Sequence, residues 1–374
     1  MNFDFVVIGA GISGAAAGFE LALHGTVAMI EAESSPGYHS TGRSAALFTP
    51  NYGSNPVRIL NQISANFFKS PPDNFCESNL LTPRGCLYVA LPGKETKLEE
   101  EFSEKAANGH NVEFMTASQA LNRAPVLRTQ NVGSAVYEPD VMDIDVATLH
   151  QGFLRGFKKR GGTILCNKRV CRIEHTSTGW EVLAEDTVIG GGVIVNAAGA
   201  WADEVGALAG ALPIGLVPKR RTVIIVEPPK SIGLSDLPCV GFWGAKPYFQ
   251  PEVDNILACL GDQTPVKAQD IRPDEMDIAL LVDWLERMTK IKVSRIGHSW
   301  AGLRSFVSDE SPVVGFDPQI PDFFWLAGQG GYGIMMSPTL GQVTAELIIK
   351  GKLPSDLIEL GLRELDISPI RLGK

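Results

Sequence analysis

The N-terminal forty residues alternate between apolar runs and small residues. The run FDFVVI at 3–8 is short and rich in β-formers, as in a central parallel strand. GAGISG at 9–14 follows it, then a helical stretch of small residues through about Leu23. A second apolar run at 26–30 ends on Glu31. This order predicts a complete strand–helix–strand unit.

Two later segments repeat the pattern of an apolar run followed by small residues. GVIVNAAG at 192–199 precedes a predicted helix at 200–208. DFFWLA at 322–327 leads into GQGGYG at 328–333 and a predicted helix at 337–350. Together with the N-terminal unit, these segments predict one layer assembled from three distant parts of the chain.

The segments between these units have a different hydrophobic pattern, which predicts more strands with alternating polar and apolar residues and more charged helices. We expect strands at 86–91, 163–174 and 180–187, further strand material in 213–298, and helices at 94–107, 117–123, 143–160 and 275–289. The predicted fold class is therefore α/β, or α+β overall. A Rossmann-type domain from 1–82, 141–212 and 299–374 is interleaved with a mainly antiparallel substrate-binding domain from 83–140 and 213–298.

The glycines of GAGISG indicate a dinucleotide site. Gly9 permits a tight turn, Gly11 lets the backbone approach a pyrophosphate, and Gly14 allows the helix to pack closely on the strand. The helix N-terminus then faces the phosphates. Glu31, at the end of the second strand, is placed to bind ribose hydroxyls and would repel a 2′-phosphate.

Composition narrows the class of protein. The 374 residues are 44% hydrophobic and 20% charged, and the net charge of −9 argues against nucleic-acid binding. The N-terminus has no Lys/Arg-rich leader and no run approaches a membrane span, so we expect a cytoplasmic protein without a transmembrane segment. No metal site is expected, because the cysteines are not spaced for zinc: Cys76, Cys86, Cys166, Cys171, Cys239 and Cys259.

The small-residue turns favour FAD over a nicotinamide cofactor. Of the two G-x-G-x-x-G matches, at 9–14 and 328–333, only the first opens a strand–helix–strand unit that ends on an acidic residue, so a single dinucleotide is expected. NAAGAW at 196–201 and GQGGYG at 328–333 add two further turns where backbone can pass close to a large planar ligand. No catalytic acid or base stands in a context typical of a nicotinamide enzyme.

The sequence resembles the D-amino-acid oxidase/glycine oxidase superfamily of FAD proteins. The motifs that carry the resemblance span nearly the whole chain: GAGISG at 9–14, HSTGRSAA at 39–46, NAAGAW at 196–201, AGLRSFVSDESPVVG at 301–315 and GQGGYGIMMSPTLG at 328–341. Within the superfamily, GYHSTGRSAA, LHQGFLRG, PKRR and SWAGLRSF most resemble bacterial FAD-dependent D-arginine dehydrogenase. The resemblance implies oxidative deamination, with hydride passing from the substrate α-carbon to flavin N5 and an imine hydrolysing to a 2-oxo acid.

The resemblance also implies the cofactor site. FAD is expected to bind noncovalently, although His39 lies where some relatives attach their flavin. The expected cofactor-binding residues are Gly9, Gly11, Ile12, Ser13, Gly14, Glu31, Ala32, His39, Ser40, Arg43, Ser44, Ala45, Val170, Ala198, Gly199, Trp201, Gly328, Gly330, Gly331, Tyr332, Gly333 and Ile334.

The substrate is expected to be a small amine that carries a carboxylate. Arg304 matches the family's carboxylate anchor, since its planar fork suits two oxygens, and Arg221 and Tyr248 match a second cation and a hydroxyl. Tyr52 and the Gly331 carbonyl match positions that hold the amino group.

The side-chain end of the substrate is expected to lie near Leu47, Thr49 and Cys86. Where arginine-specific relatives carry a glutamate this chain has Cys86, and a histidine of theirs is Leu47 here. We therefore expect a neutral side chain, and the resemblance favours the D enantiomer.

Other interpretations stay open at this point. Secondary or N-methyl amino acids are a close variant. A 2-hydroxy-acid dehydrogenase would need a general base, for which His298 is the candidate. A flavin-binding scaffold without turnover, or a flavoprotein acting on RNA, is opposed by the Arg/Tyr set and by the acidic charge. The electron acceptor is not indicated by any motif.

Overall fold

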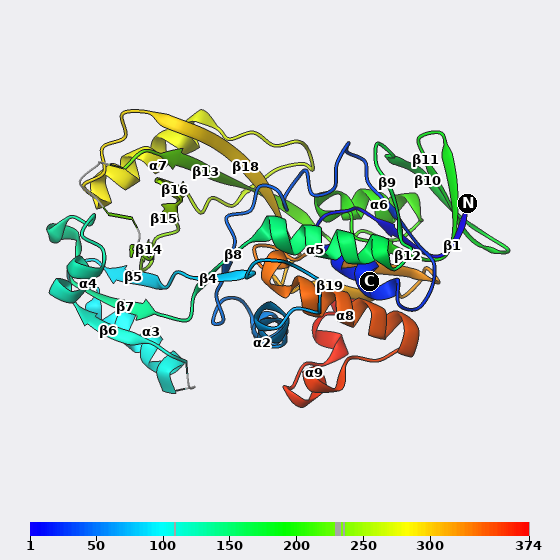
Figure 1. Cartoon of the computed structure of the whole chain (residues 1–374), viewed down its shortest axis with the longest axis horizontal. Coiled ribbons are helices and arrows are strands. Elements are labelled where there is room, and N and C mark those ends of the chain that lie inside the picture. Colours follow the sequence, from blue (N-terminus) through cyan, green and yellow to red (C-terminus); the bar gives the residue numbers. More distant parts are fainter. Residues whose placement is uncertain (108–109, 229–232, 235, 374) are drawn as a thin grey trace.

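The computed structural model describes residues 1–107, 110–228, 233–234 and 236–373. Two large sheets lie at opposite ends of its long axis (Figure 1). Strands β1, β9 and β10–β12 gather at one end with the N-terminus, and β5–β7 and β14–β16 gather at the other. The long strands β13 (Val217–Val226) and β18 (Ile296–Phe306) run from the second sheet toward the first.

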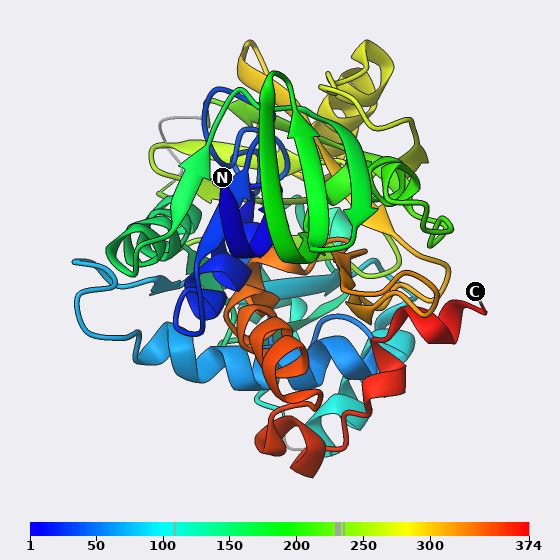
Figure 2. The ribbon, with the colours of Figure 1, turned by 90° about the vertical axis from the view of Figure 1, so that its right-hand side faces the viewer.

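The first sheet has a parallel core in the order β9-β2-β1-β12-β20. Its strands are β1 (Asn2–Ile8), β2 (Val27–Ile30), β9 (Thr163–Leu165), β12 (Thr187–Asn196) and β20 (Phe323–Ala327). The strands β10 (Val170–Thr176), β11 (Gly179–Ala184) and β19 (Val313–Phe316) extend it by antiparallel pairing. Strands β10 to β12 face the viewer in Figure 2. The GAGISG, NAAGAW and GQGGYG turns come together because β1, β12 and β20 are parallel neighbours.

Helices from distant parts of the chain pack together beside this sheet. Helix α1 (Ile12–Leu21) contacts both α5 (Val146–Lys159) and α8 (Gly333–Lys350), and α2 (Asn55–Lys69) packs on α8. Their apolar faces form the largest buried cluster. This half also contains α6 (Ala202–Leu208) and α9 (Ser355–Glu359).

The second sheet is antiparallel apart from the pairing of β5 with β14. Its order is β17-β13-β16-β15-β14-β5-β7-β6, with β18 paired to β13. These strands are β5 (Cys86–Ala90), β6 (Glu113–Thr116), β7 (Ser134–Glu138), β14 (Cys239–Phe242), β15 (Tyr248–Glu252), β16 (Asn255–Cys259) and β17 (Thr264–Pro265). Helices α3 (Glu95–Ala107), α4 (Ala117–Arg123) and α7 (Glu275–Met288) accompany it.

A small third sheet joins the loop after residue 46 to the start of β5. Strands β3 (Leu47–Phe48) and β4 (Leu81–Pro83) both pair with β8 (Met142–Ile144). The amides of Arg84 and Gly85 donate to the Val141 carbonyl at 3.2 and 2.8 Å, which fixes the entry to β5.

The expected fold class is confirmed, with differences in single elements. Helix α2 was not predicted at all, and α8 begins at Gly333, earlier than the expected residue 337. Pro338 lies inside α8 and cannot donate to the Ile334 carbonyl, but the Ser337 hydroxyl donates to that carbonyl at 2.9 Å. The predicted domain boundary at 299 falls within β18, so the division into two domains remains a prediction.

Candidate functional site

One elongated cavity collects most of the expected site residues. At one end it is lined by Glu31 and Lys168, along its middle by the glycine turns, and at the other end by Arg221, Tyr248 and Arg304. The parallel core of the first sheet supplies the first two parts and the second sheet supplies the last. The cavity therefore runs from a nucleotide-type end to a cationic end.

The first glycine turn is tightly packed. Gly9 has φ +104°, and a Cβ there would lie 2.4 Å from the Ala197 carbonyl oxygen, so the first and second turns touch through backbone. A Cβ on Gly14 would lie 1.9 Å from the Gly9 carbonyl oxygen. Gly14 thus sets the approach of α1 to β1 and does not line the cavity.

The acidic residue after β2 is held at the nucleotide end. Glu31 is 8% exposed, and its two carboxylate oxygens accept from the amides of Ala10 and Glu33 at 3.0 and 2.9 Å. Each oxygen keeps a further lone pair for a ribose hydroxyl. Lys168 and Arg169, which the sequence did not indicate, line the same end.

The 39–46 loop links the cavity to the second sheet. The Ser40 hydroxyl donates to the Leu303 carbonyl at 2.7 Å, and the Trp300 indole donates to the Arg43 carbonyl at 3.0 Å. Arg43 pairs with Asp270 and donates to the Ile271 carbonyl. The Arg43 side chain therefore anchors the loop, although the residue also lines the cavity as expected.

The cavity fits FAD. Glycines line it at three separate turns, and at Gly199, with φ +57°, an added Cβ would meet no atom within 4 Å, so that face is open to a ligand. The Ser13 hydroxyl donates to Gln329 Oε1 at 2.7 Å, and the buried Gln329 Nε2 has no acceptor among the described residues. A flavin or a pyrophosphate would supply the acceptor that this buried amide group needs.

The first turn is also held by a residue that was not predicted. Thr41, within HSTGRSAA, accepts a hydrogen bond from the Ile12 amide at 2.9 Å and so caps α1 from another segment. Thr41 and Gln329 both lie inside motifs that the sequence already indicated, and both line the cavity.

The cationic end carries two guanidinium groups without carboxylate partners. In the part of the chain that the structure describes, no acidic side chain lies within ion-pair distance of Arg221 or Arg304. Arg221 is 9% exposed, and its Nε donates to the Asp262 carbonyl at 2.9 Å. Burying such charges is costly unless an anion joins them, so this end is built for an anionic ligand.

The neighbouring Arg220 lies on the other face of the same strand and forms ion pairs with carboxylates. Arg220 Nη2 lies 2.7 Å from Asp277 Oδ2 and its Nε lies 3.8 Å from Asp262 Oδ2. Because side chains alternate along β13, Arg221 faces the cavity while Arg220 is neutralised outside it. Of the two adjacent arginines in PKRR, the structure therefore selects Arg221.

The hydroxyl groups at this end stay protonated at ordinary pH. Burial raises the pKa of Tyr248 well above its usual value, with Cys259 adding to the rise. Burial, Tyr52 and Glu310 raise the pKa of Tyr332 to about 12. Burial disfavours the charge of Arg304, but Tyr248, Cys259 and Tyr52 outweigh it and raise the Arg304 pKa. The site thus presents a permanent cation beside a hydroxyl donor.

Most predicted residues line the cavity, and some do not. The predicted residues outside the lining are Gly14, Leu47, Thr49, Tyr52, Cys86 and Tyr332. The Tyr332 ring packs on Tyr52, with centroids 5.1 Å apart. Cys86 and Leu47 pack in one apolar cluster with Tyr248, which does line the cavity.

His298, the candidate base, does not line this cavity. It stacks on Trp300, with centroids 5.4 Å apart, and lies along a neighbouring open groove with Arg272. The expectation that His298 could act as a base at the site was wrong, because β18 lines the cavity with residues 302–305 and not with residue 298. The described residues also contain no group of three or more acidic, His or Cys side chains arranged for a metal ion.

The fold and the site together define an oxidoreductase that binds FAD. The model of the "FAD dependent oxidoreductase" family, DAO, matches residues 4–347, and the chain belongs to this family. The resemblance to the superfamily of FAD-dependent oxidoreductases is therefore confirmed, while a special closeness to D-arginine dehydrogenase is not shown.

Relatives agree with this assignment. The chain is 24% identical over 375 residues to glycine oxidase of Geobacillus kaustophilus, covering 96% of this chain and 97% of the relative. It is 25% identical to "FAD-dependent oxidoreductase domain-containing protein 1" of Xenopus laevis, covering 93% and 79%. The structure of L-proline dehydrogenase from P.horikoshii superposes with a TM-score of 0.84 and 23% identity, covering 99% and 97%.

No helix among the described residues is both long and apolar enough to cross a membrane.

The protonation of this site predicts how carboxylate binding depends on pH. Since the pKa values of Arg304 and Tyr248 are both raised, neither group loses its proton between about pH 7 and about pH 10. A simple carboxylate inhibitor that lacks an amine should bind with a constant Kd across that range, measured by titrating the flavin absorbance. A Kd that rises with an apparent pKa inside the range would contradict the assignment of the carboxylate to these two groups.

Proposed function

We propose that this protein oxidises a small amino acid, anchored by its α-carboxylate on Arg304, Arg221 and Tyr248. The observation that carries the proposal is the pair of guanidinium groups that line the cavity without carboxylate partners among the described residues. A bidentate Arg–carboxylate pair would offset the cost of burying Arg304 and fix the orientation of the substrate.

The amino group of the substrate is assigned to Tyr52 and the Gly331 carbonyl. Gly331 lines the cavity, and a Cβ there would lie 2.7 Å from Arg304 Nη1, so the backbone at 331 is close to the carboxylate anchor. Tyr52 is near enough to raise the pKa of Arg304. This arrangement supports binding of an amine and a carboxylate that are attached to the same carbon atom of one substrate.

The chain's own residues position the substrate and do not need to supply a strong base. When bound, FAD supplies the two-electron oxidant of the reaction. The Arg and Tyr side chains orient the α-carbon of the substrate. A substrate whose amine is neutral loses the hydrogen of its α-carbon as hydride. The resulting imine of the substrate hydrolyses in water to a 2-oxo acid and ammonia, while the electron acceptor that completes turnover is unassigned.

The preferred substrate is proposed to be a D-amino acid with a neutral side chain. Cys86 is 5% exposed and packs with Leu47, Val141, Cys239 and Tyr248 in an apolar wall behind the carboxylate anchor, and of these residues Tyr248 lines the cavity. None of these side chains offers a carboxylate to a cationic substrate side chain. The D enantiomer rests on the resemblance alone, and several structural neighbours are named for L-amino acids.

A secondary amine is a second candidate. The P.horikoshii structure that superposes on nearly the whole chain is named for L-proline, whose amine is secondary. A 2-hydroxy acid is less well supported, because His298 does not line the cavity.

Arg304 tests the proposal directly. Arg304→Ala should lower kcat/KM by about 30- to 4,000-fold, because removing one partner of a buried charge pair costs about 2–5 kcal/mol. Arg304→Lys keeps the charge without the fork and should lie between wild type and Arg304→Ala. FAD content should match wild type in both variants. The measurement is anaerobic flavin reduction across both enantiomers of the amino acids. If the flavin of Arg304→Ala is reduced by the amino acid and by the corresponding amide as efficiently as the flavin of wild type, the carboxylate anchor lies elsewhere.

The side-chain preference has its own test at Cys86. In wild type, neutral D-amino acids should give a higher kcat/KM than D-arginine or D-lysine. Cys86→Glu should shift the ratio toward basic substrates, because it adds a carboxylate to the apolar wall. Cys86→Ser is the matched control, since it changes polarity without adding charge. The highest wild-type kcat/KM for a basic amino acid would contradict this part of the proposal.

The cofactor is proposed to be noncovalent FAD. His39 Nε2 lies 3.0 Å from Glu33 Oε1 and its ring lies 4.6 Å from Trp201, so the imidazole is held by protein groups at the Glu31 side. Acid or heat precipitation should release FAD and leave a colourless pellet, as measured by chromatography of the supernatant. Flavin retained on the precipitated chain, and lost in His39→Ala, would show a covalent link instead.

A further inference from the structure

Tyr52 is the exposed residue of an otherwise half-buried loop between β3 and α2. It is 46% exposed, and its amide donates to the Thr49 carbonyl in a local turn, at 3.2 Å. Its ring packs on Tyr332. A hydroxyl that binds substrate from such a loop must be positioned by other contacts, because loop backbone is otherwise mobile.

A buried carboxylate holds the loop on one side of Tyr52. Asn51 Nδ2 donates to Glu138 Oε1 at 2.7 Å. Glu138 is 2% exposed, at the end of β7 opposite Cys86, and no cation in the described part of the chain pairs with it. Its hydrogen bond to Asn51 therefore connects the loop directly to the second sheet.

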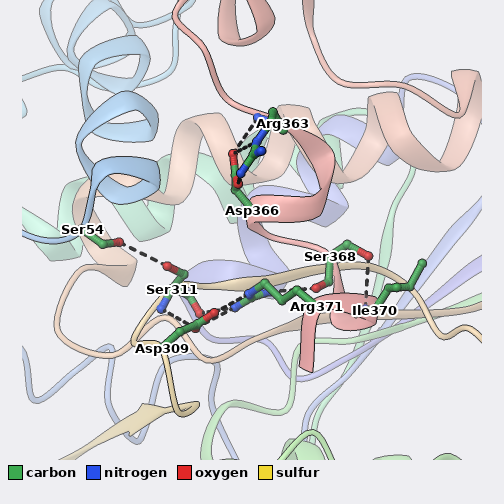
Figure 3. A network of polar contacts seen from close by, with 8 residues as sticks. All are labelled: Ser54, Asp309, Ser311, Arg363, Asp366, Ser368, Ile370 and Arg371. Carbon is green, nitrogen blue, oxygen red and sulfur yellow. Dashed lines mark hydrogen bonds and ion pairs between the residues drawn. The ribbon is translucent and has the colours of Figure 1, made fainter. Parts of the chain in front are cut away.

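A second connection holds the loop on the other side of Tyr52. The hydroxyls of Ser54 and Ser311 lie 3.2 Å apart, and the Ser311 amide donates to Asp309 Oδ1 at 3.0 Å. Figure 3 shows Ser54 directed at Ser311, at the edge of a network that runs to Arg371. Residues 309–311 follow β18, the strand that carries Arg304.

Arg371 fixes the turn that receives Ser54. Its Nε and Nη2 donate to the two Asp309 carboxylate oxygens at 2.7 and 3.1 Å, and Nη2 also donates to the Ser311 carbonyl at 2.8 Å. The Arg371 side chain is 9% exposed, whereas the Asp309 side chain that it holds is 44% exposed. The guanidinium lies between Asp309, Ser311 and Ser368 (Figure 3).

We propose that Glu138 and Arg371 are positioning residues that hold the Tyr52 hydroxyl at the amine end of the substrate. One acts through Asn51 and the other through Ser311 and Ser54, so Tyr52 is fixed relative to both β7 and the end of β18. This inference rests on the proposed function, in which Tyr52 binds the substrate amine. Neither residue touches substrate or cofactor.

Matched variants distinguish a positioning role of Glu138 and Arg371 from a purely structural role. Glu138→Gln keeps an oxygen for Asn51 and should behave as wild type, whereas Glu138→Leu loses it and should raise the substrate KM about 2- to 10-fold. Arg371→Ala should raise KM by a similar factor, with Arg363→Ala as its control. Arg363 lies in the same segment but pairs with Asp366, away from the loop (Figure 3). The Kd for FAD should be unchanged in all four.

A double-mutant cycle tests whether these effects pass through Tyr52. Tyr52→Phe combined with Arg371→Ala should have no higher KM than Tyr52→Phe alone, because the positioned hydroxyl is already absent. Independent, multiplying effects would overturn the proposal. So would a loss in Glu138→Gln as large as in Glu138→Leu, which would indicate that the charge itself acts on the substrate.

Failure of the proposed function gives a different result. If Tyr52→Phe leaves KM unchanged, the assignment of Tyr52 to the amine is wrong, whatever Glu138 and Arg371 do. If Glu138→Leu does not fold, Asn51→Ala breaks the same contact from the half-buried loop side and should raise KM in the same way. A wild-type KM in Asn51→Ala, with Tyr52→Phe impaired, would overturn the role of Glu138.

Discussion

The register between β13 and β18 is the constraint on which the rest of the site depends. It places Arg221 opposite Gly302 and Arg304 opposite Lys219, so both arginines share one face of the sheet. A slip of one residue would turn Arg221 outward and bring its paired neighbour Arg220 into the cavity. Outside the cavity, Arg220 forms ion pairs with Asp262 and Asp277. These ion pairs favour the orientation of β13 in which Arg220 faces away from the cavity.

The two sheets divide the chemistry of the cavity. The parallel core supplies backbone turns, where the absence of side chains creates space, and the antiparallel sheet supplies charged and hydroxyl side chains. The 39–46 loop joins them, since Ser40 donates to the Leu303 carbonyl, next to Arg304, and Arg43 donates to the Ala301 carbonyl on the same strand. In the proposed function, a cofactor held by the first sheet would thereby lie against a substrate held by the second.

Sequence patterns identified the features that depend on local chemistry. The glycine turns, Glu31 and the buried strands were predicted because each has a steric or hydrogen-bonding signature in neighbouring residues. Arg304 and Tyr248 were found only by resemblance, since an arginine inside a strand has no local signal for the face it will occupy. The position of His298 was misjudged for the same reason: six residues along β18 separate it from Arg304, and only the pairing with β13 shows which part of the strand meets the cavity. Thr41 capping α1 across 29 positions could not be read from spacing at all.

The interleaved order of the parallel strands has a consequence for biosynthesis. Strand β1 is the first strand of the sheet to be synthesised. Its neighbour β12 pairs on its other side with β20, which lies more than a hundred residues further along the chain. A ribosome-bound chain that has completed β1, β2 and α1 still lacks the GQGGYG turn and both arginines of the substrate end. FAD captured at that stage would be held by one wall only, so cofactor loading should follow synthesis of β20 and α8 and not accompany it.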